Sequence, residues 1–399
     1  MSSTRNWLKA TAIAALLAVV FALYAQQITT RQPIRDSNFA KFWIAGHMLT
    51  TGQSPYDPVQ WRAAHLALGT TSIPDRIFLY PLPQVYFLTP LALLPIEQAF
   101  AVWIFASLVL VALCCYTLLR SISRDVAARL LLPLVLLLLL FGPLYLSMQI
   151  GSIGAIALGV LAAAILLLDR GYDLPAGLLL SFLILKPSQG LPIMGLAGLW
   201  LLFRQKYRAV YGLLGGSALL MLSGFLYDPQ WVQKFAANSQ LVSDKTLGAQ
   251  SNVYSFAYRL CAQNTLCSNR VVGSLGAVIL LALAAWYLWS RRERLSAWEA
   301  FDLIIPVGFV TTLYLWSYDQ LLYVIPITWI AAVLYTRYRS YWPMIGFLAV
   351  LDIIAFVALG VQAYTKQDLL SLATTVIVLG SWFMVKWLMG KSETGNRRT

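Results

Sequence analysis

The amino-acid sequence predicts an all-α protein that is embedded in a membrane and crosses it about 12 times. Of its 399 residues, 59% are hydrophobic and only 11% are charged, and the mean hydropathy is +0.71. A soluble domain usually carries about 25% charged residues because its surface lies in water. Here apolar stretches long enough to cross a hydrocarbon core recur along the chain. In lipid each backbone polar group needs a partner inside the protein, so these stretches are predicted to be helices.

The expected membrane spans follow one another with short connections, except at two places where long loops intervene. They are 7–26, 98–119, 130–147, 152–168, 174–186, 189–203, 209–226, 271–289, 300–316, 320–335, 342–361 and 369–389. Residues 174–203 could instead form one long tilted helix. Two helices broken at Lys186-Pro187 are favoured, because Arg170 and the basic cluster at Arg204 should then lie on the same side of the membrane.

The distribution of the basic residues predicts the orientation. The net charge is +13, and Lys and Arg gather in short clusters between the apolar spans. These clusters are Arg120, Arg124 and Arg129; Arg204, Lys206 and Arg208; Arg291, Arg292 and Arg294; Arg337 and Arg339; and Lys391, Arg397 and Arg398. Such clusters are typical of cytoplasmic loops and not of a nucleic-acid groove, so no nucleic-acid partner is expected.

This orientation divides the chain. Residues 1–390 are expected to form one transmembrane domain in the inner (plasma) membrane, with both termini cytoplasmic and 391–399 as a basic tail. The loops at about 27–97 and 227–270 are then extracytoplasmic. The N-terminal segment resembles a signal peptide, but no good small-residue cleavage site precedes Gln26, so an uncleaved first helix is expected.

Four polar residues that interrupt the apolar pattern are all placed on the extracytoplasmic side by this topology. They are Asp36, Gln149, Lys186 and Asp319. Ionisable groups at the membrane edge cost about 2.5–3.5 kcal/mol on insertion scales and are functional candidates. Polar residues are also common at helix turns. Their shared side is what one extracytoplasmic site predicts.

The first loop contains a predicted helix. Apolar residues from Phe39 to Leu49 recur near helical spacing, which predicts an amphipathic helix in the plane of the membrane interface. Gly52 can end this helix, and residues 55–58 form a turn. Asp36 stands just before the helix. It is either the residue that caps the helix N-terminus or a carboxylate held at the membrane surface as a general base, and the pattern favours neither.

The cysteines and histidines give few further predictions. Cys114 and Cys115 lie in an apolar span and are expected to be packing residues. Cys261 and Cys267 lie in the second long loop, where they could form a disulfide or remain thiols, and the spacing does not decide between them. The only histidines, His47 and His65, have no carboxylate cluster near them in the sequence, so no metal site is expected.

Five segments together resemble glycosyltransferase family 87. They are Asp36 with FWIAGHMLTTGQSPYDP at 42–58, FLYPLPQVYFLTPLALLP at 78–95, QIGSIG at 149–154, AGLLLSFLILKP at 176–187 and SYDQLLYVIP at 317–326. The family belongs to the GT-C superfamily and includes polyprenyl-phosphomannose-dependent mannosyltransferases of mycobacterial phosphatidylinositol mannoside synthesis. The resemblance covers roughly residues 30–335. It departs from the family at Met148 and Gly151, where members often have Gly and Asn.

The resemblance implies a GT-C-like bundle with interfacial helices in the first loop and an inverting transfer of a sugar. The donor would be a sugar on a polyprenyl phosphate, and the acceptor a hydroxyl of a lipid or glycan. Asp36 aligns with the catalytic Asp and would act as the general base. No metal or other cofactor is required if Lys or Arg neutralises the departing phosphate.

The remaining site residues receive provisional roles under the same resemblance. Lys186 is the first choice for the donor phosphate because its long stem can reach the head-group level, although it could merely anchor a helix end. Weaker candidates for the phosphate are Lys41 and Arg259. Substrate contacts are assigned to Asp319, Gln149, Tyr56, Tyr80 and Trp43. Asp319 could also cap a helix, and interfacial aromatic belts explain such Tyr and Trp residues without a ligand.

Two other functions fit parts of the pattern. A transporter or flippase would suit about 12 helices and a Pro-broken helix, but the charged groups lie at one face and not at the midplane, and no internal repeat is apparent. A non-catalytic scaffold is the second alternative. The sugar is open as well: a mannose-like hexose is favoured, and arabinofuranose is the other sugar class considered.

Overall fold

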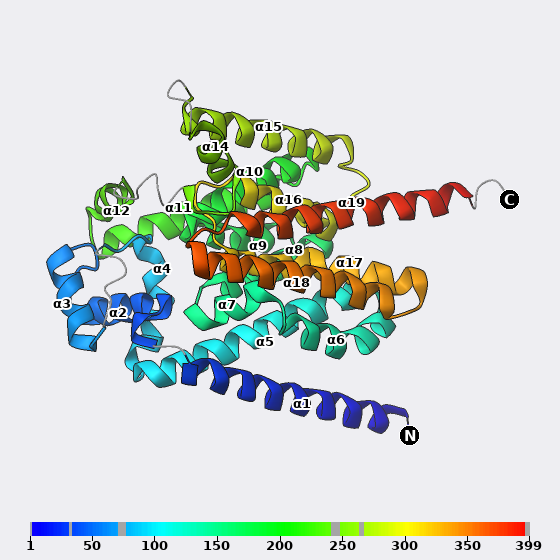
Figure 1. The fold of residues 1–399 in the computed structure, drawn as a ribbon, viewed down its shortest axis with the longest axis horizontal. Coiled ribbons are helices and arrows are strands. Elements are labelled where there is room, and N and C mark those ends of the chain that lie inside the picture. Colours follow the sequence, from blue (N-terminus) through cyan, green and yellow to red (C-terminus); the bar gives the residue numbers. More distant parts are fainter. Residues whose placement is uncertain (1, 32–33, 71–76, 241–247, 263–266, 396–399) are drawn as a thin grey trace.

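The computed structural model describes all residues except 1, 32–33, 71–76, 241–247, 263–266 and 396–399. Over this part of the chain the regular elements are all helices, as predicted (Figure 1). The first is α1 (Ser2–Arg31), which packs along α5 (Ile96–Ile122). The predicted tail at 391–399 is partly helical, because α19 runs to Gly395, and residues 396–399 lie outside the described part.

The first long loop folds into several short helices. They are the 3-10 turn η1 (Ile34–Asp36), α2 (Asn38–Thr50), α3 (Pro58–Leu68), α4 (Leu82–Tyr86) and the 3-10 segment η2 (Thr89–Leu93). Asp57 begins α3 by accepting hydrogen bonds from the backbone N–H groups of Val59 and Gln60, at 2.8 and 3.0 Å. A second apolar cluster, separate from the main core, forms around Trp61 and Phe78, so this loop has its own packed interior.

The first-loop helix α2 is buried over more of its surface than its apolar stripe predicts. Eight of its thirteen residues are buried, including Ala40, Lys41 and Ala45, because α3, α4, η2 and α5 surround the helix on several sides. The periodic apolar stripe is therefore only part of its buried surface. The prediction that the helix ends near Gly52 is confirmed, since α2 stops at Thr50 and Gly52 has a φ of +73°.

The middle of the chain forms the next group of helices. It consists of α5, α6 (Arg124–Leu138), α7 (Gly142–Ile150), α8 (Gly154–Asp169), α9 (Asp173–Leu180), the 3-10 segment η3 (Ser181–Leu185), α10 (Pro187–Phe203) and α11 (Tyr207–Ser223). Cys114 and Cys115 are buried in α5, as predicted. The predicted break at Lys186-Pro187 is present: η3 ends at Leu185, and Pro187 is the first residue of α10.

The rest of the chain completes the bundle. It comprises η4 (Gly224–Leu226), α12 (Trp231–Gln240), α14 (Val253–Cys261), α15 (Asn269–Ser290), α16 (Ala297–Thr311), η5 (Ser317–Tyr323), α17 (Val324–Tyr338), α18 (Trp342–Thr365), η6 (Leu369–Ser371) and α19 (Leu372–Gly395). The structure pairs Cys261 with Cys267 in a disulfide, which decides the question that the sequence left open.

Within the described part of the chain, six helical segments are long and apolar enough to cross a membrane, or seven if the bent pair α6 and α7 is one span. The other predicted spans fall on shorter helices: part of α1, α8, α9 with η3, α10, and the 15-residue α16. The chain is therefore a helical membrane protein by length and composition, and the count of 12 crossings stays a prediction.

The two long predicted loops lie at the same end of the molecule. Figure 1 shows α2, α3 and α12 at one end of the bundle, and the start of α1 and the end of α19 at the other. The separation matches the sidedness that the basic clusters predict, with both termini opposite the long loops.

Candidate functional site

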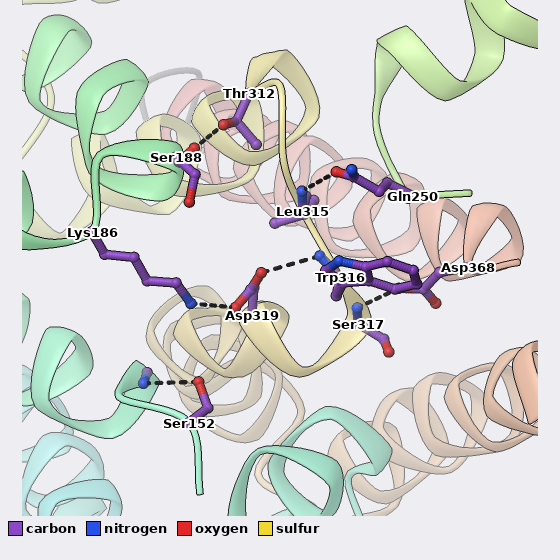
Figure 2. A network of polar contacts seen from close by, with 11 residues as sticks. Ser152, Lys186, Ser188, Gln250, Thr312, Leu315, Trp316, Ser317, Asp319 and Asp368 are labelled. Atoms are coloured by element: carbon purple, nitrogen blue, oxygen red, sulfur yellow. Dashed lines mark hydrogen bonds and ion pairs between the residues drawn. The ribbon is translucent and has the colours of Figure 1, made fainter. Parts of the chain in front are cut away.

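A buried ion pair joins two residues that the sequence singled out. The Lys186 Nζ atom lies 2.6 Å from Asp319 Oδ1, and the side chains are 10% and 0% exposed (Figure 2). The two residues are 133 positions apart. A Lys and an Asp that are both removed from water are compatible only because each neutralises the other.

Local backbone structure places Lys186 at this position. Pro187 has no N–H and cannot continue the preceding helical turn, so the chain bends at Lys186 before α10 begins. The first turn of α10 then packs directly on η3: a Cβ atom at Gly190 would lie 1.9 Å from the Leu183 carbonyl oxygen. Only glycine permits this close approach, which holds the Lys186 backbone against the bundle.

Asp319 is oriented by its own turn. Its Oδ2 atom accepts a hydrogen bond from the Trp316 backbone N–H at 3.1 Å, and its Oδ1 atom accepts one from the Lys186 ammonium (Figure 2). Lys186 Nζ also lies 5.5 Å from the centroid of the Tyr318 ring. The ammonium thus retains hydrogen-bonding capacity beyond its bond to Asp319, because it has three N–H groups.

A second set of polar contacts fixes the backbone of the turn that contains Asp319. Asp368 accepts hydrogen bonds from the Ser317 backbone N–H and from the Ser371 hydroxyl, the latter at 2.5 Å. Gln250 Oε1 accepts from the Leu315 backbone N–H at 2.6 Å (Figure 2). Gln250 and Asp368 are both fully buried. The second long loop and the turn before η6 therefore fix the backbone on which Asp319 sits.

Asp368 predicts a pH dependence of stability. Burial raises the pKa of Asp368 from near 3.8 to about 7, although the bonds from Ser371 and Ser317 favour its charged form. Above pH 4 the unfolded chain releases a proton that the folded protein still binds, so stability should fall as pH rises toward 7 and then level off. Asp368→Asn, which mimics the protonated acid, should flatten this slope when the melting temperature is measured in detergent between pH 5 and 8. An unchanged slope in Asp368→Asn would contradict the assignment, and the exposed Asp125→Asn serves as the control.

An apolar cavity of about 220 Å³ lies beside the ion pair. Its walls come from α4 and the two residues after Tyr86, from α8, from η3 with the start of α10, and from η5, and they include Phe87, Ile156 and Phe182. Phe87 is 49% exposed, so the cavity reaches the outer surface of the bundle. Lys186 lines this cavity together with Gln84 and Gln189. A cation at the wall of an otherwise apolar cavity suits a ligand with an anionic head and a hydrocarbon body.

Asp36 lies in the first long loop, two residues before α2. It ends η1 and is partly buried. The capping role that the sequence allowed for Asp36 is wrong, because Ser37 is the N-cap and its hydroxyl accepts from the Ala40 backbone N–H at 3.3 Å. Phe39 packs on the turn after α7: a Cβ atom at Gly151 would lie 2.4 Å from the Phe39 Cβ. Ser152 of this turn appears below Lys186 in Figure 2.

The three predicted aromatic residues lie in the first-loop region around α2. The Tyr56 hydroxyl donates to the Tyr80 carbonyl at 2.6 Å, and Tyr80 packs on Phe42 with ring centroids 4.8 Å apart. Trp43 donates its Nε1–H to the Leu94 carbonyl at 3.0 Å and stacks on His47. These contacts account for the positions of Tyr56 and Trp43 by packing within the loop.

The other candidates lie on different elements of the structure. Lys41 is buried in α2, and Gln149 is partly buried near the end of α7, which packs against η5. Arg259 lies on the exposed surface of α14 and donates to Gln367. Of the predicted residues, the structure brings Lys186 and Asp319 into direct contact. Within the part of the chain that the structure describes, no three metal-ligating side chains gather at one point.

Several polar residues at this site were not predicted from the sequence. Gln84 and Gln189 line the cavity, Tyr318 faces Lys186, and Asp368 supports the turn. Gln189 follows Lys186 by three positions in a helix, which would have placed it on the same side. Gln84 and Asp368 carry no comparable local signal.

Comparison with known proteins identifies a family. The model of glycosyltransferase family 87 matches residues 78–315, more than half of the chain. This range contains Gln149, Lys186 and Arg259, begins after Asp36 and ends before Asp319. No curated protein and no solved structure matches the chain.

Proposed function

This chain belongs to glycosyltransferase family 87, and from that premise we propose that it takes its sugar from a polyprenyl phosphate. The acceptor is a hydroxyl of a lipid or glycan at the extracytoplasmic face of the inner membrane. The observation that carries the proposal is the position of Lys186, a buried cation at the wall of a cavity whose other sides are mainly apolar. A lipid phosphate has the matching division into an anionic head and a hydrocarbon chain.

The proposed chemistry is a single displacement. Asp36 takes the proton from the acceptor hydroxyl as its oxygen forms a bond to the anomeric carbon. The bond from this carbon to the phosphate oxygen breaks, the polyprenyl phosphate leaves with the electron pair, and the anomeric centre inverts. Lys186 offsets the negative charge that develops on the phosphate, in a site where burial strengthens the interaction. Asp319 keeps the ammonium in position.

The other assignments belong to the same proposal. Lys41 and Arg259 remain secondary phosphate contacts, and Gln149, Tyr56, Tyr80 and Trp43 contact the substrates. A hexose of the mannose type is the favoured sugar. The bundle is GT-C-like, with its active site on the side of the long loops.

A transfer assay tests the donor class. Purified protein in lipid should move label from a radioactive polyprenyl phosphomannose to a lipid extract and should give no product from the nucleotide sugar GDP-mannose. Label that crosses a vesicle membrane without a covalent product would favour a transporter instead. Transfer from GDP-mannose would reject the lipid donor, and faster transfer from polyprenyl phosphoarabinofuranose would reject the hexose.

A further inference from the structure

Two buried glutamine side chains in the cavity have no hydrogen-bond partner for part or all of their amide. Gln84 comes from α4 and Gln189 from the first turn of α10, and each is 3% exposed. Among the described residues, Gln84 Nε2 and Oε1 have no partner. Gln189 Nε2 makes no hydrogen bond of normal geometry, although the Gln189 amide lies close enough to the Asp319 carboxylate to interact with it. Both residues line the cavity that Lys186 also lines.

Unpaired amides in a buried site destabilise the protein that contains them. Native proteins pair nearly all buried polar groups, and those left unpaired need a physical explanation. A ligand that supplies the missing partners is such an explanation here, because two distant segments bring their amides to one cavity. The other wall residues, such as Ile156 and Ile193, offer no side-chain hydrogen bond.

The available groups are mainly hydrogen-bond donors. Each amide has two N–H groups, and the Lys186 ammonium donates only one of its three to Asp319. Gln189 also lies at the N-terminus of the 17-residue α10, where the helix dipole favours an anion. A phosphate ester, with several acceptor oxygens and a negative charge, fits this arrangement.

We infer that Gln84 and Gln189, together with Lys186, bind the phosphate ester head of the lipid donor. The inference rests on the proposed function, since it takes the cavity as the donor site. It adds two donor-binding residues from separate elements, so that the first loop and α10 hold the same head group.

The test measures ligand binding and apo stability separately. Gln→Met substitution at position 84 or 189 keeps the length of the side chain and removes the amide. Farnesyl phosphate serves as the probe, and farnesol and inorganic phosphate separate its chain from its charge. Each variant should bind farnesyl phosphate about tenfold more weakly, as expected for the loss of one hydrogen bond to a charged group. Farnesol binding should not weaken, and the melting temperature of apo Gln84→Met, which loses no hydrogen bond within the protein, should stay equal or rise.

The outcomes are distinct. Gln233→Met, on the exposed surface of α12, is the matched control and should bind like the wild type. If Gln84→Met and Gln189→Met retain wild-type affinity for farnesyl phosphate, or if Gln84→Met lowers the apo melting temperature as a structural role requires, the inference is overturned while the proposed donor class stands. If inorganic phosphate alone binds as tightly as farnesyl phosphate, or if the wild-type protein binds no farnesyl phosphate, the lipid-phosphate donor fails and the inference fails with it.

Discussion

Replacing Lys186 with methionine should remove most of the transferase activity and also lower the stability of the protein. The substitution leaves the Asp319 carboxylate buried without its cation, and breaking such a pair costs about 3–5 kcal/mol. It also removes the charge assigned to the leaving phosphate. Loss of one such electrostatic contact lowers turnover by about 10²–10³-fold.

A second substitution separates these two effects. In Lys186→Met with Asp319→Leu neither charge remains, so much of the lost stability should return while turnover stays low. Lys206→Met is the matched control, because Lys206 pairs with Asp173 at 2.7 Å in a more exposed position on α9 and α11. It should retain both turnover and most of the stability. The melting temperature and the initial transfer rate are measured for each variant. A double variant with wild-type turnover would exclude Lys186 from phosphate binding.

Replacing Asp36 with asparagine should lower the turnover rate by about 10²–10⁴-fold, because a positioned general base contributes a factor of this size. The protein should remain folded, because Asp36 does not cap α2. A neutral hydroxyl is a poor nucleophile, and asparagine cannot take its proton. Single-turnover transfer from a labelled polyprenyl phosphosugar, measured beside the melting temperature, tests this result.

Ser37→Ala gives the reciprocal control. Ser37 supplies the cap of α2, so its loss should cost about 1 kcal/mol of stability and keep turnover within a few-fold of wild type. If Asp36→Asn transfers sugar at the wild-type rate, Asp36 is not the base and the mechanism needs another residue. If it lowers the melting temperature more than Ser37→Ala does, its role is structural.

Much of the helical pattern could be predicted from local sequence. The break at Lys186 follows from the backbone of Pro187, and the burial of Cys114 follows from its apolar neighbours. The extent to which α2 is buried could not be predicted in this way. An apolar stripe shows that one side of a helix is buried, but neighbouring elements decide whether the polar side is buried as well, as happens to Lys41.

Individual residues of the candidate site could be predicted from the sequence, but the contacts between them could not. Topology from charge placed Lys186 and Asp319 on one side of the membrane, and the resemblance gave them roles. Neither could show that the two side chains bond to each other, nor that Gln84 from the first loop enters the same cavity. The disulfide of Cys261 and Cys267 was likewise left open by two thiols in one loop.

The sequence by itself determined that this protein is a helical membrane protein, and it predicted where the apolar helices run and which polar residues share a side. Hydropathy, proline breaks and charge clusters depend on residues that are close together in the sequence, so they can be recognised from the sequence alone. Only the tertiary structure decided which of these residues meet. Contacts across 133 positions depend on how helices rotate and cross when they pack, and no local pattern encodes that rotation.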